Sequence, residues 1–229
     1  GKDNWLFNAI DISQLLNKNQ STTQNNLIRV LGHELRNSLT PMSSMADTLL
    51  SSEVLNEAQT RKVLSRIQQR SDRLMTFIDQ YSQLSQLPPV QAQWFDFSAL
   101  LIEAKAMISQ RCQVSFQGNN QCYGDINQVA QVLINILKNA EEAVTEQNCQ
   151  VNITLYSSNN EQTIEVTDNG PGFANLDNVL TPFYTTKPQG SGIGLSLCAE
   201  ISRNHQGQLS VSNITDGGAK IAMTWPMST

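Results

Sequence analysis

Apolar residues recur every three or four positions along two stretches in the first third of the chain. The first seam contains Ile28, Leu31, Leu35, Ser38, Met42, Met45 and Leu49. The second contains Val63, Ile67, Arg70, Leu74, Phe77, Tyr81 and Leu84. This spacing is typical of the a and d positions of a coiled coil, with about three heptads in each stretch. The pattern therefore predicts a hairpin of two helices joined near residues 51–53.

Such a hairpin buries little apolar surface alone, so we expect it to pair with a second copy as a four-helix bundle. A single helical domain without a dimer is the alternative. Residues 1–25 carry mostly polar side chains on the same seam, which weakens a coiled coil, so we interpret them as a connecting or signalling helix. The helical rhythm stops at Leu87-Pro88-Pro89, because proline cannot continue a helix. The hairpin domain is thus expected over residues 26–88.

Residues 94–229 alternate between short strand patterns and apolar helical patterns. Helices are expected after Phe97, with Ser98 as the cap, after Asp125, and over residues 192–204. Strands are expected at 114–116, 122–123, 151–155 and 163–166, with a closing hairpin around residues 216–218. The pattern predicts an α+β sandwich with a sheet on one side.

Composition narrows the function classes. The chain has 15 Lys and Arg against 20 Asp and Glu, a net charge of -5, which argues against nucleic-acid binding through a basic surface. No run of 18 apolar residues and no signal peptide occur, so we expect a cytoplasmic piece of a longer protein. Any membrane anchor would belong to a missing N-terminal region. The four cysteines, Cys112, Cys122, Cys149 and Cys198, lack zinc-site spacing and are expected to be reduced.

Two glycine-rich motifs lie in the second half of the chain. Residues 168–172 (DNGPG) follow a strand, and residues 190–195 (GSGIGL) open a helix. Glycines let backbone N–H groups approach phosphates, but one such loop alone is more often a plain turn. Their position late in the chain also does not suit a dinucleotide-binding Rossmann unit.

Two asparagines make the glycine motifs more specific. Asn135 and Asn139 are four residues apart on the helix expected after Asp125, so they share one face. The amide oxygen of Asn139 suits Mg²⁺, which prefers oxygen ligands. The motifs together predict a site for a magnesium-bound nucleotide. Because the net charge is negative, the triphosphate must be held by Mg²⁺, loop amides and local cations such as Lys187.

In this combination, residues 125–226 resemble the ATP-binding domain of sensor histidine kinases, within the superfamily that includes gyrase and the heat-shock chaperones. Residues 135–140 resemble its N box, 168–172 and 190–195 its glycine boxes, and 183–187 its F box. The resemblance implies a Bergerat-type ATP-binding fold. It implies that Asp168 accepts from the adenine amino group, that Asn139 holds Mg²⁺, and that Asn135 assists at the phosphates.

The same resemblance makes residues 173–190 a short lid over ATP. Thr185, Thr186 and Lys187 would then lie near the phosphates. The remaining residues that the resemblance assigns to ATP binding are Gly170, Gly172, Gly190, Gly192, Gly194 and Leu195.

The second motif, His33-Glu34-Leu35-Arg36-Asn37, lies inside the first expected helix. His33 falls off the apolar seam, so its ring should face solvent, and a lone surface histidine usually has no role. With Glu34 beside it and Asn37 one turn further on, it resembles the H box of the kinases' dimerisation and phosphotransfer domain. The resemblance implies that His33 is the phosphoacceptor and Glu34 the base that takes its ring proton. Asn37 would position a water that dephosphorylates the partner.

One position departs from the family pattern. Proline commonly stands five residues after the histidine, and this chain has Ser38 there. Pro41 can still bend the helix, because it frees the carbonyl of Asn37. Prolines at both places and a short lid are typical of the nitrogen-regulation subgroup, which the chain resembles. His205 is expected to cap the last helix and to take no part in catalysis.

The resemblance implies a homodimeric two-component kinase that uses Mg²⁺ and ATP to phosphorylate His33. The phosphoryl group would pass to an aspartate on the receiver domain of a cognate response regulator, which the kinase could also dephosphorylate. A mechanical ATPase of the same superfamily would carry a glutamate at position 135, where Asn135 cannot take a proton. A scaffold that senses nucleotide without catalysis would lack a phosphate or metal residue. The handedness of the hairpin decides whether His33 meets its own ATP domain or its partner's.

Overall fold

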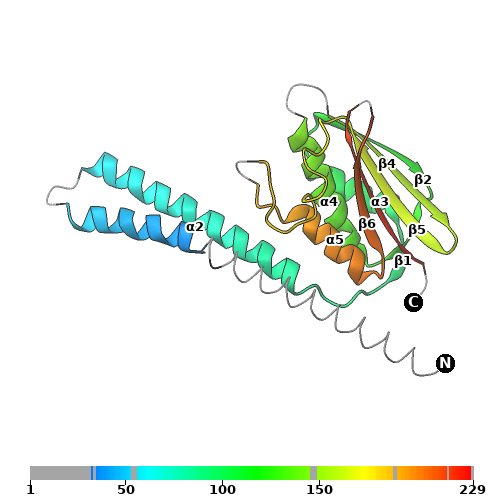
Figure 1. The fold of residues 1–229 in the computed structure, drawn as a ribbon, viewed down its shortest axis with the longest axis horizontal. Helices are drawn as coiled ribbons and strands as arrows, with labels where there is room; N and C mark the ends of the chain where they lie inside the picture. The colour runs from blue at the N-terminus through cyan, green and yellow to red at the C-terminus, as the bar shows by residue number, and fades with distance from the viewer. Residues whose placement is uncertain are drawn as a thin grey trace. The chain divides into compact units, whose positions relative to one another are not determined.

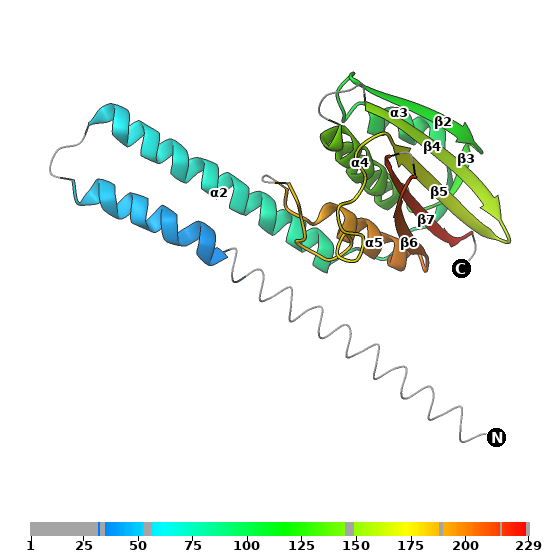
Figure 2. The same cartoon turned by 45° about the horizontal axis from the view of Figure 1, so that its top comes forward.

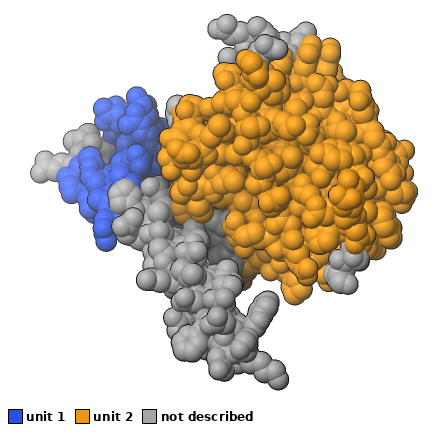
Figure 3. Space-filling model, turned by 45° about the vertical axis from the view of Figure 1, so that its right-hand side comes forward, with its two compact units in different colours: residues 1–79 blue, residues 80–229 orange. Residues whose placement is uncertain are grey.

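The computed structural model describes residues 32, 35–52, 56–144, 149–187, 190–215 and 217–227 of the 229 residues, with backbone alone for residues 80, 81 and 83–85. The chain forms two compact units, residues 1–79 and residues 80–229 (Figure 3). The connecting helix expected over residues 1–25 lies outside the described residues.

The first unit is a helical hairpin, as the apolar seams predict (Figures 1 and 2). One helix covers residues 35–50, and α2 (Glu57–Ser85) follows after a turn. Asn56 caps α2, since its Oδ1 accepts from the N–H groups of Ala58 at 3.0 Å and Gln59 at 3.3 Å. The helix ends at Ser85, before the two prolines at 88 and 89.

The hairpin seam is only half-buried. Its half-buried members are Leu35, Ser38, Met42, Met45, Leu49, Val63, Ile67, Arg70, Leu74 and Phe77. Among the described side chains from residue 35 to residue 79, none is fully buried. Large apolar side chains beside the seam, such as Leu64 and Met75, are more than half exposed. The hairpin therefore leaves an apolar surface that a single copy does not cover.

Pro41 has the backbone effect that the sequence predicts. The helix continues through Pro41, which has no N–H to donate to the carbonyl of Asn37. Arg70 Nη1 of α2 donates a long hydrogen bond of 3.5 Å to this Asn37 carbonyl. An arginine within the apolar seam thus donates to the carbonyl that Pro41 cannot reach with an N–H.

The second unit is built on a mixed sheet. Its described strands run in the order β2 (Cys112–Gly118), β4 (Cys149–Ser158), β5 (Glu161–Asp168), β7 (Ala219–Pro226) and β6 (Gln208–Asn213). β2 is parallel to β4, and the other neighbours are antiparallel. A smaller sheet pairs β1 (Gln93–Asp96) with β3 (Gln121–Gly124). The helices α3 (Phe97–Lys105), α4 (Ile126–Ala143) and α5 (Gly194–Asn204) lie on one side of the main sheet (Figures 1 and 2).

This arrangement is the expected sandwich, with one local correction. The start of α3 is capped by Asp96, whose Oδ1 accepts from the Ser98 N–H at 2.8 Å, so Ser98 is not the cap. The Asp96 carboxylate can reach the free N–H of Ser98, which lies two residues further along the chain, so Ser98 is part of the first turn of α3. Along β7 every second residue is buried, as a sheet with one covered face requires.

Buried polar side chains join the small sheet to the main one. Gln162 of β5 is fully buried, and its Oε1 accepts from the Tyr123 N–H at 2.8 Å while its Nε2 donates to the Gln121 carbonyl at 3.1 Å. Trp225 of β7 donates from Nε1 to the Tyr123 carbonyl at 2.7 Å. Because both ends of Gln162 are satisfied, its burial costs little and fixes where β3 lies.

The expectation that the cysteines are reduced is wrong for two of them. Cys112 and Cys149 form a disulfide, with Cα atoms 4.4 Å apart. The parallel pairing of β2 with β4 places these two residues in the same register, although 37 residues separate them in the sequence. Cys122 and Cys198 are free and buried, and burial raises the pKa of each thiol to about 12.

His205 caps α5, as expected, and its ring also connects two helices. Nδ1 donates to the Ile201 carbonyl at 2.9 Å, so Nε2 is the acceptor for the N–H of Asp125 at 3.1 Å. Burial lowers the pKa of His205, because the charged ring would lose its hydration. The neutral ring thus bonds the end of α5 to the start of α4. Separately, no helix among the described residues is both long and apolar enough to cross a membrane.

We predict that His205 makes folding depend on pH. Since its pKa is lower in the folded chain than its ordinary value, the unfolded chain binds the proton more readily. The stabilising effect of the neutral ring is present above about pH 6.5 and is lost as the pH falls below it. Thermal unfolding should therefore show a larger drop in Tm between pH 7.5 and pH 5.5 for the wild type than for His205→Gln. Equal drops in the two proteins would contradict this role for the ring.

Candidate functional site

The polar face of α4 forms the floor of the site. Asn135, Asn139 and Glu142 are spaced by four and then three residues, so they lie along one stripe of the helix. The opposite face is buried and contains Val129, Val132, Leu133, Ile136, Leu137 and Ala140. At the start of α4, Asp125 Oδ1 accepts hydrogen bonds from the N–H groups of Asn127 at 3.0 Å and Gln128 at 3.2 Å. The apolar face and the cap together fix which way the asparagines point.

The start of α5 lies beside these asparagines. A methyl group added to Gly194 would lie 3.7 Å from Asn139 Nδ2 and 4.0 Å from Asn135 Oδ1. The N-cap residue Ile193 offers no side-chain hydrogen bond, so side chains do not cap the first N–H groups of α5. Asn135 Nδ2 is buried and has no hydrogen-bond partner among the described residues. The uncapped helix start is suited to binding a phosphate.

The DNGPG motif forms the loop after β5. Asp168 Oδ1 accepts from the N–H groups of Gly170 at 2.8 Å and Ala219 at 3.1 Å. Both bonds go to Oδ1, which leaves Oδ2 as the oxygen that could accept a hydrogen bond from an exocyclic amino group. A methyl group on Gly170 would lie 3.2 Å from the Cβ of Ala143, which brings this loop to the end of α4.

The lid begins at a clamp made by Asn213 of β6. Its Oδ1 accepts from the Phe173 N–H at 2.7 Å, and its Nδ2 donates to the Phe173 carbonyl at 2.9 Å. A Cβ on Gly172 would lie 2.7 Å from this Oδ1, and Gly172 has a φ of 77°, so only glycine fits there. Among its described residues the lid has no helix or strand.

The far end of the lid is a tight turn around Lys187. Thr185 Oγ1 accepts from the Lys187 N–H at 3.0 Å, and the Gly190 N–H donates to the Lys187 carbonyl at 3.1 Å. A methyl group on Gly190 would lie 2.5 Å from Thr185 Oγ1. The Phe183 N–H donates to the Gly192 carbonyl at 2.8 Å, which ties the lid to the start of α5. Thr185 thus holds the turn together.

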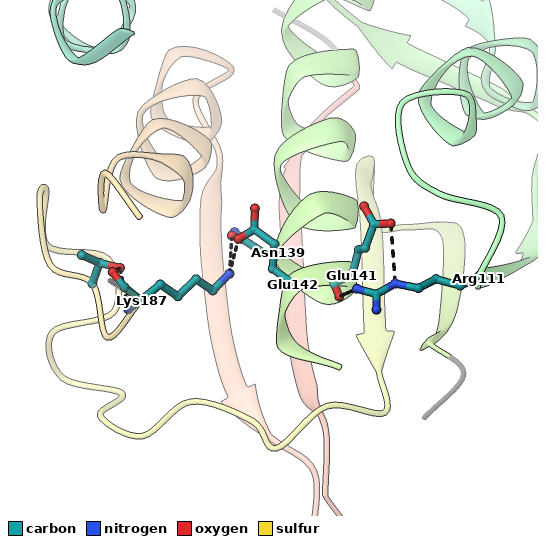
Figure 4. Close-up of polar contacts among 6 residues, drawn as sticks. Arg111, Asn139, Glu141, Glu142 and Lys187 are labelled. Atoms are coloured by element: carbon teal, nitrogen blue, oxygen red, sulfur yellow. Dashed lines mark hydrogen bonds and ion pairs between the residues drawn. The ribbon is translucent and has the colours of Figure 1, made fainter. Parts of the chain in front are cut away.

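Lys187 directs its ammonium group to the floor of the site (Figure 4). Its Nζ lies 2.6 Å from Glu142 Oε2 and 3.4 Å from Asn139 Oδ1. A cation therefore lies between two hard oxygen atoms, which are the kind of ligand that Mg²⁺ prefers. Asn139 and Glu142 fit a magnesium ion for this reason. The described residues contain no cluster of three or more His, Cys, Asp or Glu that could hold a metal, so phosphates and water would complete its shell.

The structure brings most of the predicted residues together around the second half of α4. Gly194 lies beside Asn135 and Asn139, Gly170 joins Asp168 to the end of α4, and Lys187 contacts Asn139. The other assigned glycines lie in the lid and its two ends, Gly172 at Asn213, Gly190 at Thr185 and Gly192 at Phe183, and Leu195 is half-buried in the first turn of α5. Thr186 is exposed on the lid. His33 and Glu34 lie outside the described residues, whereas Asn37 is exposed on the hairpin.

Two residues at the site have no place in the sequence motifs. Glu142 could have been found by its spacing, since it stands three residues after Asn139 on the same helix. Asn213 gives no such signal, because it contacts Phe173 from 40 residues away.

Two family models match the chain. The "His Kinase A (phospho-acceptor) domain" covers residues 23–89, and the "Histidine kinase-, DNA gyrase B-, and HSP90-like ATPase" covers residues 124–229. Sporulation kinase B of Bacillus subtilis is 25% identical over 93% of this chain and 52% of its own length. A putative sensor histidine kinase, NtrY-like, of Rickettsia bellii is 29% identical over 83% of this chain and 33% of its own length. The chain spans about half or less of these relatives.

Solved structures share the fold. The histidine kinase AdeS of Acinetobacter baumannii matches with a TM-score of 0.61 at 20% identity, over 86% of this chain and 98% of that one. The histidine kinase ThkA, in complex with the response regulator protein TrrA, matches with a TM-score of 0.65 at 22% identity, over 89% of this chain and 61% of that one.

We predict that Asp168→Asn weakens ATP binding at least tenfold and leaves the fold intact. The amide oxygen can still accept hydrogen bonds from the N–H groups of Gly170 and Ala219. In place of Oδ2, however, the variant has an NH₂ group, which is a donor like the adenine amino group, so the two cannot form a hydrogen bond. Losing one charged hydrogen bond costs about 1.5–3 kcal/mol. Calorimetric titration with a non-hydrolysable ATP analogue measures the loss. Asp177→Asn, an exposed lid change of equal charge, is the control and should bind as the wild type does. Equal affinity in the two variants would rule out the adenine contact.

Proposed function

Because this chain belongs to the sensor histidine kinases of two-component systems, with NtrY-like kinases among its relatives, we propose that it transfers the γ-phosphoryl group of ATP to its own His33. The observation that carries this proposal is the convergence on α4. A fixed carboxylate, an uncapped helix start and two oxygens around a cation lie together there. These groups match, in order, the adenine, the phosphates and the metal of Mg²⁺-ATP.

Each residue has a part in the proposed reaction. Asp168 accepts from the adenine amino group, while Asn135 and the amides from Gly192 to Leu195 hold the phosphates. Asn139 would hold Mg²⁺, which, when bound, offsets the negative charge of the phosphates. A ring nitrogen of His33 bonds to the γ-phosphorus as the bond to ADP breaks. Glu34 takes the proton that leaves the other ring nitrogen.

The active form is proposed to be a homodimer. No described side chain of the hairpin is fully buried, although ten seam positions face inward. A second hairpin would cover this half-buried seam and the exposed side chains of Leu64 and Met75. The phosphoacceptor helix would then be one of four in the bundle.

The second substrate is proposed to be an aspartate on the receiver domain of a separate response regulator. The complex of ThkA with the response regulator protein TrrA supports this choice of partner. Asn37 is exposed one helical turn after His33, where an amide could orient a water towards an aspartyl phosphate. The chain would act in the cytoplasm, where ATP is available, and any membrane anchor would lie in an N-terminal region outside this sequence.

A mechanical ATPase of the same superfamily is the less favoured function. It needs a carboxylate base for water at the position of Asn135, and an amide cannot take that proton. In the structure this position carries a buried amide beside Gly194. This arrangement suits a phosphate contact more than the activation of water.

We predict that the purified chain, given Mg²⁺ and γ-labelled ATP, gains an acid-labile and alkali-stable label. His33→Gln should lower labelling at least 100-fold, because the nucleophile is gone. The variant should still bind a non-hydrolysable ATP analogue as tightly as the wild type, which separates loss of the acceptor from loss of the site. Labelling of His33→Gln at the wild-type level would overturn the assignment.

We predict that Asn37→Ala preserves autophosphorylation and slows dephosphorylation of the phosphorylated regulator at least tenfold. The side-chain amide of Asn37 is proposed to orient the water that attacks the aspartyl phosphate of the regulator. It has no proposed part in binding ATP, so autophosphorylation should not need it. Timed loss of label from the regulator, with and without the kinase, measures the second activity. An equal loss of both activities would mean that the Asn37 side chain supports the structure of the helix itself.

A further inference from the structure

Glu142 is a carboxylate at the site to which neither the sequence motifs nor the proposed reaction gives a role. Its side chain is 58% exposed and pairs with the lid residue Lys187 at 2.6 Å. We propose that Glu142 is a specificity-determining residue that makes this site select magnesium-bound ATP over free ATP. The inference rests on the proposed function, because it concerns the same nucleotide.

The geometry places Glu142 next to the metal ligand. Lys187 Nζ is held by Glu142 Oε2 and by Asn139 Oδ1, so both oxygens lie around one cation (Figure 4). Glu142 stands one helical turn after Asn139, with its carboxylate on the same stripe of α4. A divalent cation that replaced the ammonium group would meet an amide oxygen and a carboxylate, either directly or through water.

The charge of Glu142 makes the exchange of cations selective. Without a nucleotide, Lys187 neutralises the carboxylate. When the lysine turns to the phosphates, the carboxylate faces a polyanion unless another cation replaces the lysine. Free ATP brings no such cation and is repelled, whereas Mg²⁺-ATP brings one. Since the chain as a whole has a charge of -5, no bulk positive potential masks this local repulsion.

The lid allows the Lys187 side chain to leave Glu142 without moving the lid backbone. The backbone of Lys187 is fixed by Thr185 Oγ1 and by the Gly190 N–H. Its ammonium group can therefore move from Glu142 to a phosphate by rotating the side chain, while the turn stays in place.

The test compares ATP affinity with and without magnesium. The dissociation constant of a non-hydrolysable ATP analogue is measured in excess Mg²⁺ and in EDTA, for the wild type and for Glu142→Gln. We expect the wild type to bind much more weakly in EDTA. In Glu142→Gln the ratio of the two constants should fall about fivefold or more, mainly because binding in EDTA becomes tighter, as removal of one nearby like charge predicts.

Glu141→Gln is the matched control. Glu141 is the neighbouring carboxylate on α4, but it accepts from the Ser109 N–H at 2.8 Å and faces Arg111, away from Lys187 (Figure 4). The hydrogen bond to Ser109 lowers the pKa of Glu141, so the control removes a full negative charge at pH 7. It should keep the wild-type ratio.

Two results would overturn the inference while the proposed function stands. The first is that Glu142→Gln has the same ratio of dissociation constants, EDTA over Mg²⁺, as the wild type. The second is that this ratio falls equally in Glu141→Gln, which would mean that the net charge of the protein, and not Glu142 itself, sets the preference. A wild type that binds no nucleotide in Mg²⁺ would instead overturn the proposed function, and this inference with it. Tm values of each variant, measured beside the titrations, separate these results from unfolding.

Discussion

The arrangement of the second unit depends on one buried carboxylate, Asp125. Its Oδ1 caps α4, its Oδ2 accepts from the Gln91 N–H at 3.0 Å, and its own N–H donates to His205. Asp125 is 6% exposed, so water screens the bonds that its two oxygens accept only a little. One side chain thereby fixes the start of α4 against the chain that enters the unit and the end of α5. The ligand residues on α4 depend on this anchor for their position.

A helix anchored and packed in this way can keep unsatisfied polar groups at its exposed end. Buried donors without partners are costly, and in native structures they are few. Here the start of α5 has no side-chain cap and lies beside Asn135 and Asn139, while the loop that carries Asp168 reaches the end of α4 at Ala143. Elsewhere in the unit the fully buried Gln162 has both ends of its amide satisfied, whereas the equally buried Ser202 Oγ has no partner among the described residues. The uncapped N–H groups at the start of α5 are therefore the hydrogen-bonding capacity that the site offers to a ligand.

Periodicity and local motifs predicted a large part of the fold. The spacing of Leu35, Met42 and Leu49 gave the hairpin seam, and the two glycine motifs were placed correctly beside a strand and a helix. The contacts that could not be predicted from the sequence are side-chain pairs between segments that are far apart in the chain. Lys187 meets Glu142 from 45 residues away, and Cys112 meets Cys149 only because their strands pair in register. Such pairs leave no periodic pattern, since each depends on how two whole elements pack.

The anchor at Asp125 also separates the linker from the phosphate end of the site. The Pro88 carbonyl accepts from Gln128 Nε2 at 3.1 Å and from Asn204 Nδ2 at 2.9 Å, so the second unit holds the chain from Pro88 onwards at the start of α4. Asn139 lies 14 residues after Asp125, about 20 Å along the helix axis. The bonds that hold the linker and the amide of Asn139 therefore lie nearly four helical turns apart on one packed helix, so the linker is held without contact to the glycine loop at the start of α5.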